Sequence, residues 1–136
     1  MLKYVIAYLS TAALFLAVDF VWLSIMANGF YRSRIPDVIG TQANYPAAIA
    51  FYLIFVAGIV IFAVSPALEN GRWTTALVYG ALFGFMAYAT YDLTNQATLK
   101  QWSTMVTIVD MGWGTFASAL CATLSLLFTR WLLATV

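Results

Sequence analysis

Between Pro46 and Pro66 the chain carries no charged side chain. About 20 residues separate the two prolines, which is the length that an α-helix needs to cross the hydrocarbon core of a bilayer. Comparable apolar runs recur along the chain. Only 8% of all residues are charged, against about a quarter in soluble domains, and the mean hydropathy is +0.91. The sequence therefore predicts an integral membrane protein.

The length of 136 residues leaves room for one domain of about four membrane-spanning helices. The predicted spans are about 2–27, 46–65, 73–95 and 103–128, with a polar segment at 28–45 that lies in the membrane interface. Short connections make successive helices antiparallel. We expect an all-α bundle of four transmembrane helices, formed by the single domain 1–136, with both termini on one side.

Several classes of chemistry are excluded by composition. Histidine is absent, which removes histidine acid–base chemistry and most zinc sites, and no haem, zinc or nucleotide motif is present. The single cysteine, Cys121, allows no internal disulfide and is expected to pack in the core. A net charge of +1 provides no basic surface for nucleic acid.

Two copies of Val-Asp-x-x-Trp lie in apolar surroundings, one at Asp19 and Trp22, the other at Asp110 and Trp113. At 1.5 Å per residue, both aspartates lie about 11 to 12 Å inside the same membrane face. Asp92 lies near the end of its span at that face. An aspartate at the centre of a span costs about 2.5 to 3.5 kcal/mol, so three carboxylates at one end of a bundle indicate a polar site.

Residues three or four positions apart share a helix face, which adds polar and aromatic neighbours to the aspartates. The candidate ligand-binding residues are Asp19, Trp22, Tyr88, Asp92, Asn95, Gln96, Thr107, Asp110 and Trp113. Arg32, Arg34 and Lys100 lie at the mouth of this site. Residues 47–64 are expected to contribute packing but no polar group. Tyr31 and Trp102 are interpreted as part of an aromatic belt at the membrane interface.

Membrane orientation does not follow from the charges. One side carries Lys3, Arg72 and Arg130, and the other carries Arg32, Arg34 and Lys100. With three cations on each side, the positive-inside rule favours neither orientation.

Three functions are compatible with these residues. The first is binding or transport of a proton, a metal ion or an organic cation, in which closely spaced carboxylates do not all ionise together. A divalent cation would be held by Asp19, Asp92 and Asp110, whereas an organic cation would stack on tryptophan. The second is a membrane-embedded enzyme that modifies a lipid or an isoprenoid. The third is a structural or accessory subunit, in which the aspartates only hydrogen-bond neighbouring helices.

Partners are less constrained by the sequence than the site is. We expect membrane lipids to surround the chain, and the site would suit a small cationic or a lipid-like ligand. Gly80 and Gly84 form a GxxxG pattern that either packs inside the monomer or supports a homo-oligomer.

Two motifs in the second half of the chain, YDLTNQATLKQW (91–102) and TIVDMGWGTF (107–116), resemble those of a family of small bacterial membrane proteins of unknown function. The segments LAVDFVWL and NYPAAIAFYLIFVAGIVIFAVSPAL also fit the pattern of that family. The resemblance covers essentially the whole chain and implies four spans in a bacterial cytoplasmic membrane. It implies no activity, so no catalytic residue is carried over from it.

Overall fold

A computed structural model describes residues 1–135, and the predicted domain also includes Val136, which lies outside the described residues. Residues 1–135 contain helices and no strand. The elements are α1 (Leu2–Met26), the π-helical turn η1 (Ala27–Tyr31), α2 (Arg32–Arg34), α3 (Tyr45–Ile59), the π-helical turn η2 (Val60–Val64), α4 (Ser65–Asn70), α5 (Trp73–Thr98) and α6 (Thr104–Thr135). The prediction of an all-helical chain is confirmed.

Three continuous helical stretches, Leu2–Arg34, Tyr45–Asn70 and Thr104–Thr135, are long and apolar enough to cross a membrane. The fourth long helix, α5, is not among them, although it has 26 residues. Its C-terminal third carries Asp92, Asn95 and other polar side chains, which reduce its apolar character. By length and composition, then, three of the four predicted spans are recovered.

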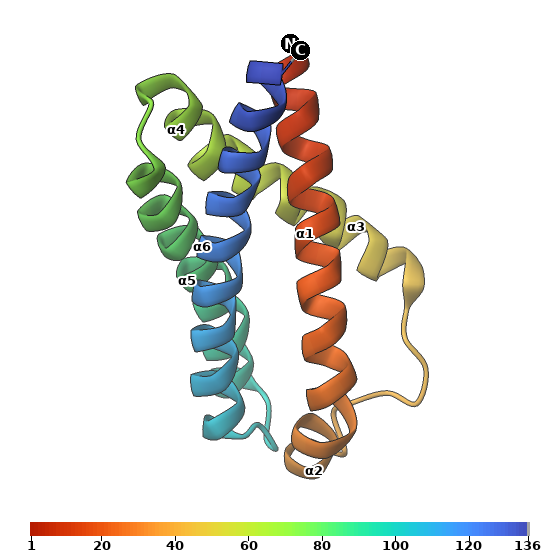
Figure 1. Cartoon of the computed structure of the whole chain (residues 1–136). Helices are drawn as coiled ribbons and strands as arrows, with labels where there is room; N and C mark the ends of the chain where they lie inside the picture. Colours follow the sequence, from red (N-terminus) through yellow and green to blue (C-terminus); the bar gives the residue numbers. More distant parts are fainter. Residues whose placement is uncertain (136) are drawn as a thin grey trace.

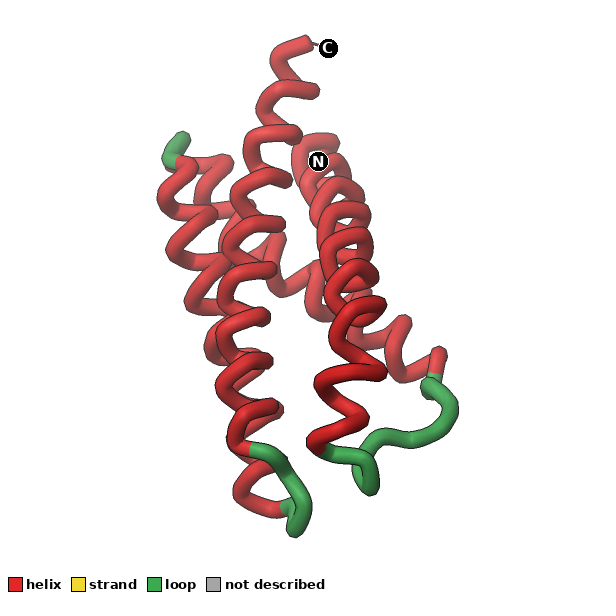
Figure 2. The backbone as a smooth tube through the Cα atoms, turned by 60° about the horizontal axis from the view of Figure 1, so that its bottom comes forward, coloured by secondary structure: helices red, strands yellow, loops and turns green. Residues whose placement is uncertain are grey.

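Helices α1, α5 and α6 run side by side, whereas α3 crosses behind α1 at an oblique angle (Figure 1). The start of α1 and the end of α6 lie at the same end of the bundle. At the opposite end, the segment between α2 and α3 forms the longest connection, and a second connection joins α5 to α6 (Figure 2). The C-terminal end of α1 therefore lies at the end of the bundle where α6 begins.

Two helices continue beyond the ends that the sequence predicts. The first does not end at Asn28 and Gly29, because the π-helical turn η1 carries the chain on into α2. The second does not end at Pro66, because this proline lies in the first turn of α4, directly after η2. The π-helical turn η2 directly precedes this proline, and a local π-helical adjustment of this kind lets a continuous membrane helix accommodate a residue that has no N–H to donate. The helix ends instead at Gly71, whose φ of 78° is left-handed.

Close packing of α5 against α6 depends on glycine. A Cβ at Gly80 would lie 2.9 Å from the Cβ of Ala122 and 2.9 Å from the carbonyl oxygen of Ser118. A Cβ at Gly84 would collide with the carbonyl oxygen of Gly114 and with the Ser118 side chain. The two glycines of the GxxxG pattern thus pack against α6 of the same chain. A homo-oligomer would have to use another face.

Buried hydroxyl groups set the register between α1 and α6. The Thr11 hydroxyl donates to Ser125 Oγ at 2.7 Å, and Ser125 donates to the carbonyl oxygen of Ala7 at 3.1 Å. The two helices are antiparallel. Asp19 follows Ala7 by twelve residues on α1, and Trp113 precedes Ser125 by twelve residues on α6, so these two residues also lie opposite each other. This register brings the two Val-Asp-x-x-Trp motifs face to face.

Candidate functional site

All three aspartates in the helices are buried. Asp92 is 0% exposed, Asp19 is 7% exposed and Asp110 is 8% exposed. They come from α5, α1 and α6 respectively. A carboxyl group removed from water needs hydrogen-bond donors or a counter-charge, so its partners define what the site can do.

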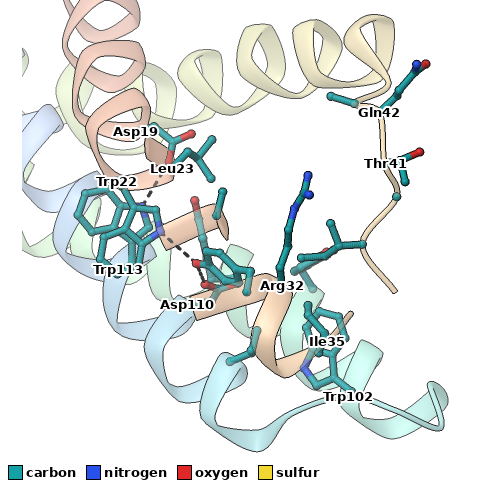
Figure 3. Close-up of a pocket in the computed structure, with 18 residues that line it drawn as sticks. Asp19, Trp22, Leu23, Arg32, Ile35, Thr41, Gln42, Trp102, Asp110 and Trp113 are labelled. Carbon is teal, nitrogen blue, oxygen red and sulfur yellow. Dashed lines mark hydrogen bonds between the residues drawn. The ribbon is translucent and has the colours of Figure 1, made fainter. Parts of the chain in front are cut away.

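The two Val-Asp-x-x-Trp motifs supply donors to each other. Trp113 Nε1 on α6 donates to Asp19 Oδ1 on α1 at 3.4 Å. Trp22 Nε1 on α1 donates at 3.0 Å to the Tyr31 hydroxyl, which in turn donates to Asp110 Oδ1 on α6. The sequence predicts that each aspartate shares a helix face with the tryptophan of its own motif, but it does not predict which group each indole N–H reaches. The pairs form across helices, because the antiparallel register places each indole N–H beside the opposite motif (Figure 3).

The two indoles also contact each other directly. The rings of Trp22 and Trp113 stack with their centroids 4.2 Å apart and their planes 7° from parallel. Stacked aromatic pairs contribute about 0.5 to 1.5 kcal/mol beyond the area that they bury. The stack forms one wall of the candidate site and holds both N–H donors in place.

Two tyrosine hydroxyls complete the network, and the sequence interpretation missed both. Tyr31, assigned to an aromatic belt, belongs to the π-helical turn η1 and donates to Asp110. Tyr52 on α3 donates to Asp19 Oδ2. The expectation that residues 47–64 contribute no polar group is therefore wrong. A usable signal was present, since Tyr52 is the one large side chain with a polar tip in an otherwise apolar run.

Asp92 has no partner among ordinary donors. Neither of its carboxyl oxygens accepts a hydrogen bond from a hydroxyl, amide or indole group in the described part of the chain. Its side chain lies next to that of Asp110 on α6. Two carboxylates bond to each other only through a shared proton, as in other sites where two acids lie side by side. Asp92 and Asp110 are thus two neighbouring buried carboxyl groups, a carboxyl pair, and Asp19 faces the same pocket as Asp110.

A pocket of about 490 Å³ lies between the C-terminal end of α1, the segment that follows it, α5 and α6. Asp19, Asp110, the two stacked tryptophans and the rings of Tyr31, Tyr88, Tyr91 and Trp102 line it. The segment from Ile39 to Ala43 forms its outer wall. Arg32 extends into the open space opposite Asp19 (Figure 3).

The remaining candidate residues divide into two groups. Tyr88 lines the pocket, and the absence of a side chain at Gly114 lets its ring pack directly on the α6 backbone. Asn95, Gln96 and Thr107 do not line it. Gln96 Nε2 donates to Thr104 at 3.0 Å, and Thr107 accepts a hydrogen bond of 2.9 Å from Trp102.

One of the three cationic residues predicted at the mouth of the site lines the pocket. Arg32 does so, whereas Arg34 lies over the Phe30 ring at 4.3 Å. Lys100 is exposed in the connection between α5 and α6 and does not line the pocket. The site therefore contains one cationic side chain beside two carboxyl groups.

The three aspartates do not form a metal centre. Within residues 1–135, no group of three or more aspartate, glutamate, histidine or cysteine side chains is arranged to hold a metal ion. The three aspartates suggested for a divalent cation differ in their partners. Hydroxyl and indole groups donate to Asp19, the Tyr31 hydroxyl donates to Asp110, and neither oxygen of Asp92 accepts from such a donor.

The fold and the site together describe an α-helical membrane protein with a polar pocket enclosed by its helices. Residues 4–127 match the family described as "Predicted membrane protein (DUF2177)", and the chain belongs to that family. The resemblance deduced from the motifs is confirmed. No curated protein and no solved structure matches the chain.

Proposed function

We propose that the chain binds a small organic cation in the pocket between α1, α5 and α6, and that binding exchanges with a proton. The observation that carries this proposal is that two buried carboxyl groups, those of Asp19 and Asp110, face one pocket beside stacked indoles. Carboxylates attract a cation, and tryptophan and tyrosine faces stabilise an ammonium group within about 6 Å. Uncharged donors, two hydroxyls and an indole N–H, bond these carboxyl groups directly.

The exchange of the cation with a proton follows from the carboxyl pair of Asp92 and Asp110. Without a cation, Asp92 and Asp110 need a proton between them, because two like charges in a low dielectric repel each other strongly. A bound ammonium group would neutralise Asp110 in place of that proton. A protein that exchanges the two could either store its ligand or transport it across the membrane.

The proposed membrane arrangement has four spans, with both termini on one side. Although α5 is more polar than the other helices, it is about 39 Å long at 1.5 Å per residue, against a hydrocarbon core of about 30 Å. Its glycine face packs along α6, itself long and apolar enough to span. The bacterial cytoplasmic membrane as its location rests on the family resemblance.

A membrane-embedded enzyme that acts on a lipid is the second candidate. An apolar pocket of about 400 Å³ adjoins Asp110 and favours this reading, since a hydrocarbon chain would fit there. Arg32 in the larger pocket could hold a phosphate group. Binding ranks first because Asp19 and Asp110 face a pocket lined by aromatic rings.

Choline and its uncharged carbon isostere, 3,3-dimethylbutan-1-ol, separate cation binding from simple pocket filling. The test titrates each into the protein in lipid nanodiscs and follows tryptophan fluorescence, since Trp22 and Trp113 line the pocket. We expect saturable binding of choline alone, weakened at least about tenfold by Asp19→Asn or Asp110→Asn. Asp37→Asn is the matched control, because Asp37 is exposed in the segment after α2. If neither probe binds, or both bind equally, cation binding is wrong.

A further inference from the structure

We propose, building on the cation-binding function, that the ligand is an amphiphilic amine whose hydrocarbon tail leaves the site between α3 and α5. The observation is a second pocket, distinct from the polar one. It has a volume of about 400 Å³ and is lined by Phe51, Phe55, Ala87, Tyr88, Tyr91 and Asp110. Five of these six side chains present methyl or aromatic surface, and the sixth is a carboxyl group.

The two pockets share three lining residues. Tyr88, Tyr91 and Asp110 line both of them. A molecule that places an ammonium group at Asp110 therefore has two directions open to its substituents. One leads into the polar pocket toward Arg32, and the other leads between aromatic rings toward α3. A compact cation would occupy only the first.

The apolar pocket leads to the side of the bundle and not to its end. Phe51 is 42% exposed and Tyr91 is 59% exposed, so both rings reach the outer surface of their helices. Phe51 lies in a helical stretch that is apolar enough to span a membrane, where the surrounding solvent is lipid. A tail that passes between these rings would stay in a hydrocarbon environment. The head group would then be withdrawn from the interface into the polar pocket.

The carboxyl group at the inner end of an apolar pocket selects against an uncharged occupant. A plain acyl chain would fill the space but would leave Asp110 without a cation, whereas an amine with a tail satisfies both. The combination of a polar head pocket and an apolar side pocket is also typical of sites that bury most of a ligand. We therefore assign a long-chain amine, taken up from the bilayer, as the class of ligand.

The test compares choline with decyltrimethylammonium as probes, in nanodiscs and by tryptophan fluorescence. Ala87→Phe fills the apolar pocket, and Phe51→Ala removes one of its walls without adding bulk. We expect both variants to weaken decyltrimethylammonium binding at least about tenfold, which corresponds to about 1.4 kcal/mol, and to leave choline binding unchanged. Ala50→Phe is the matched control, because Ala50 is exposed on α3 and does not line the pocket.

Each outcome bears on one proposal. Equal effects on the two probes, or no effect of either variant on the decyl probe, would overturn the tail pocket and leave cation binding standing. Failure of both probes to bind wild-type protein would overturn cation binding itself. If dodecanol, which lacks the ammonium group, competes as well as the decyl probe, the pocket takes any hydrocarbon and the assignment to an amine is wrong.

Discussion

Trp22 on α1 lies flat against Trp113 on α6, with ring centroids 4.2 Å apart. The two residues occupy the same position in the two copies of Val-Asp-x-x-Trp, one from each end of the chain. Each indole then donates toward the aspartate of the other copy, directly from Trp113 and through Tyr31 from Trp22. The repeated motif therefore acts as a reciprocal connection between two antiparallel helices and not as two independent pairs.

Trp22→Phe tests the hydrogen bond of Trp22 separately from its ring stacking. Phenylalanine keeps an aromatic face against Trp113 but lacks the N–H that reaches Tyr31. We expect the free energy of unfolding to fall by about 1 kcal/mol, the net contribution of one hydrogen bond. The measurement is unfolding in mixed micelles with increasing denaturing detergent. Trp131→Phe is the control, since Trp131 is 61% exposed at the other end of α6 and its change should alter stability little.

Tyr52→Phe removes the hydroxyl that donates to Asp19. Because Asp19 is 7% exposed, its oxygen would lose a donor that water cannot easily replace. We expect a loss of about 1 to 3 kcal/mol in the same unfolding measurement. Tyr45→Phe, at a residue 72% exposed near the start of the same helix, provides the comparison. Equal stability of the two variants would show that the bond from Tyr52 contributes nothing.

Gly84→Ala and Gly112→Ala test the contact between α5 and α6. A methyl group at Gly84 would collide with the backbone of Gly114, which cannot move without separating the helices. At Gly112 no atom lies within 4 Å of the added carbon. We expect Gly84→Ala to lower the unfolding temperature strongly, and Gly112→Ala to raise stability by up to about 1 kcal/mol because alanine favours a helix. The reverse order would contradict the packing described.

Stability should depend on pH through the pair of Asp92 and Asp110. At low pH one proton bonds the two carboxyl groups, and at high pH its loss leaves two adjacent negative charges. We therefore expect the unfolding temperature to fall as pH rises. Asp92→Asn offers a permanent N–H donor to Asp110 and should flatten this profile. Asp37→Asn, in the exposed segment after α2, should keep the wild-type slope.

Asp110→Leu distinguishes a working carboxyl group from a packing residue. The substitution removes the acceptor of the Tyr31 hydroxyl and the neighbour of Asp92. We expect a larger loss of stability than for Asp110→Asn, which keeps the shape and one acceptor. Thermal unfolding across pH compares the two variants with wild type. If Asp110→Leu were as stable as wild type with the same pH profile, the carboxyl group would contribute nothing beyond packing.

The sequence alone determined the all-helical class and the membrane character of the chain. These properties depend on local composition and on the fixed rise of a helix. An apolar run of about 20 residues has one stable form in a bilayer, because only a helix satisfies every backbone group internally. The family resemblance, too, could be deduced from contiguous motifs.

Only the tertiary structure decided which groups meet. Helical spacing places Trp22 beside Asp19 on one face, but it does not say that Trp113 supplies the donor from the facing helix. Nor does it show that Tyr52 reaches Asp19, or that η1 directs Tyr31 toward Asp110. The physical reason is that a helix face has many possible partners. The register of α1 against α6, set by buried hydroxyls and small residues far from the site, selects one of them.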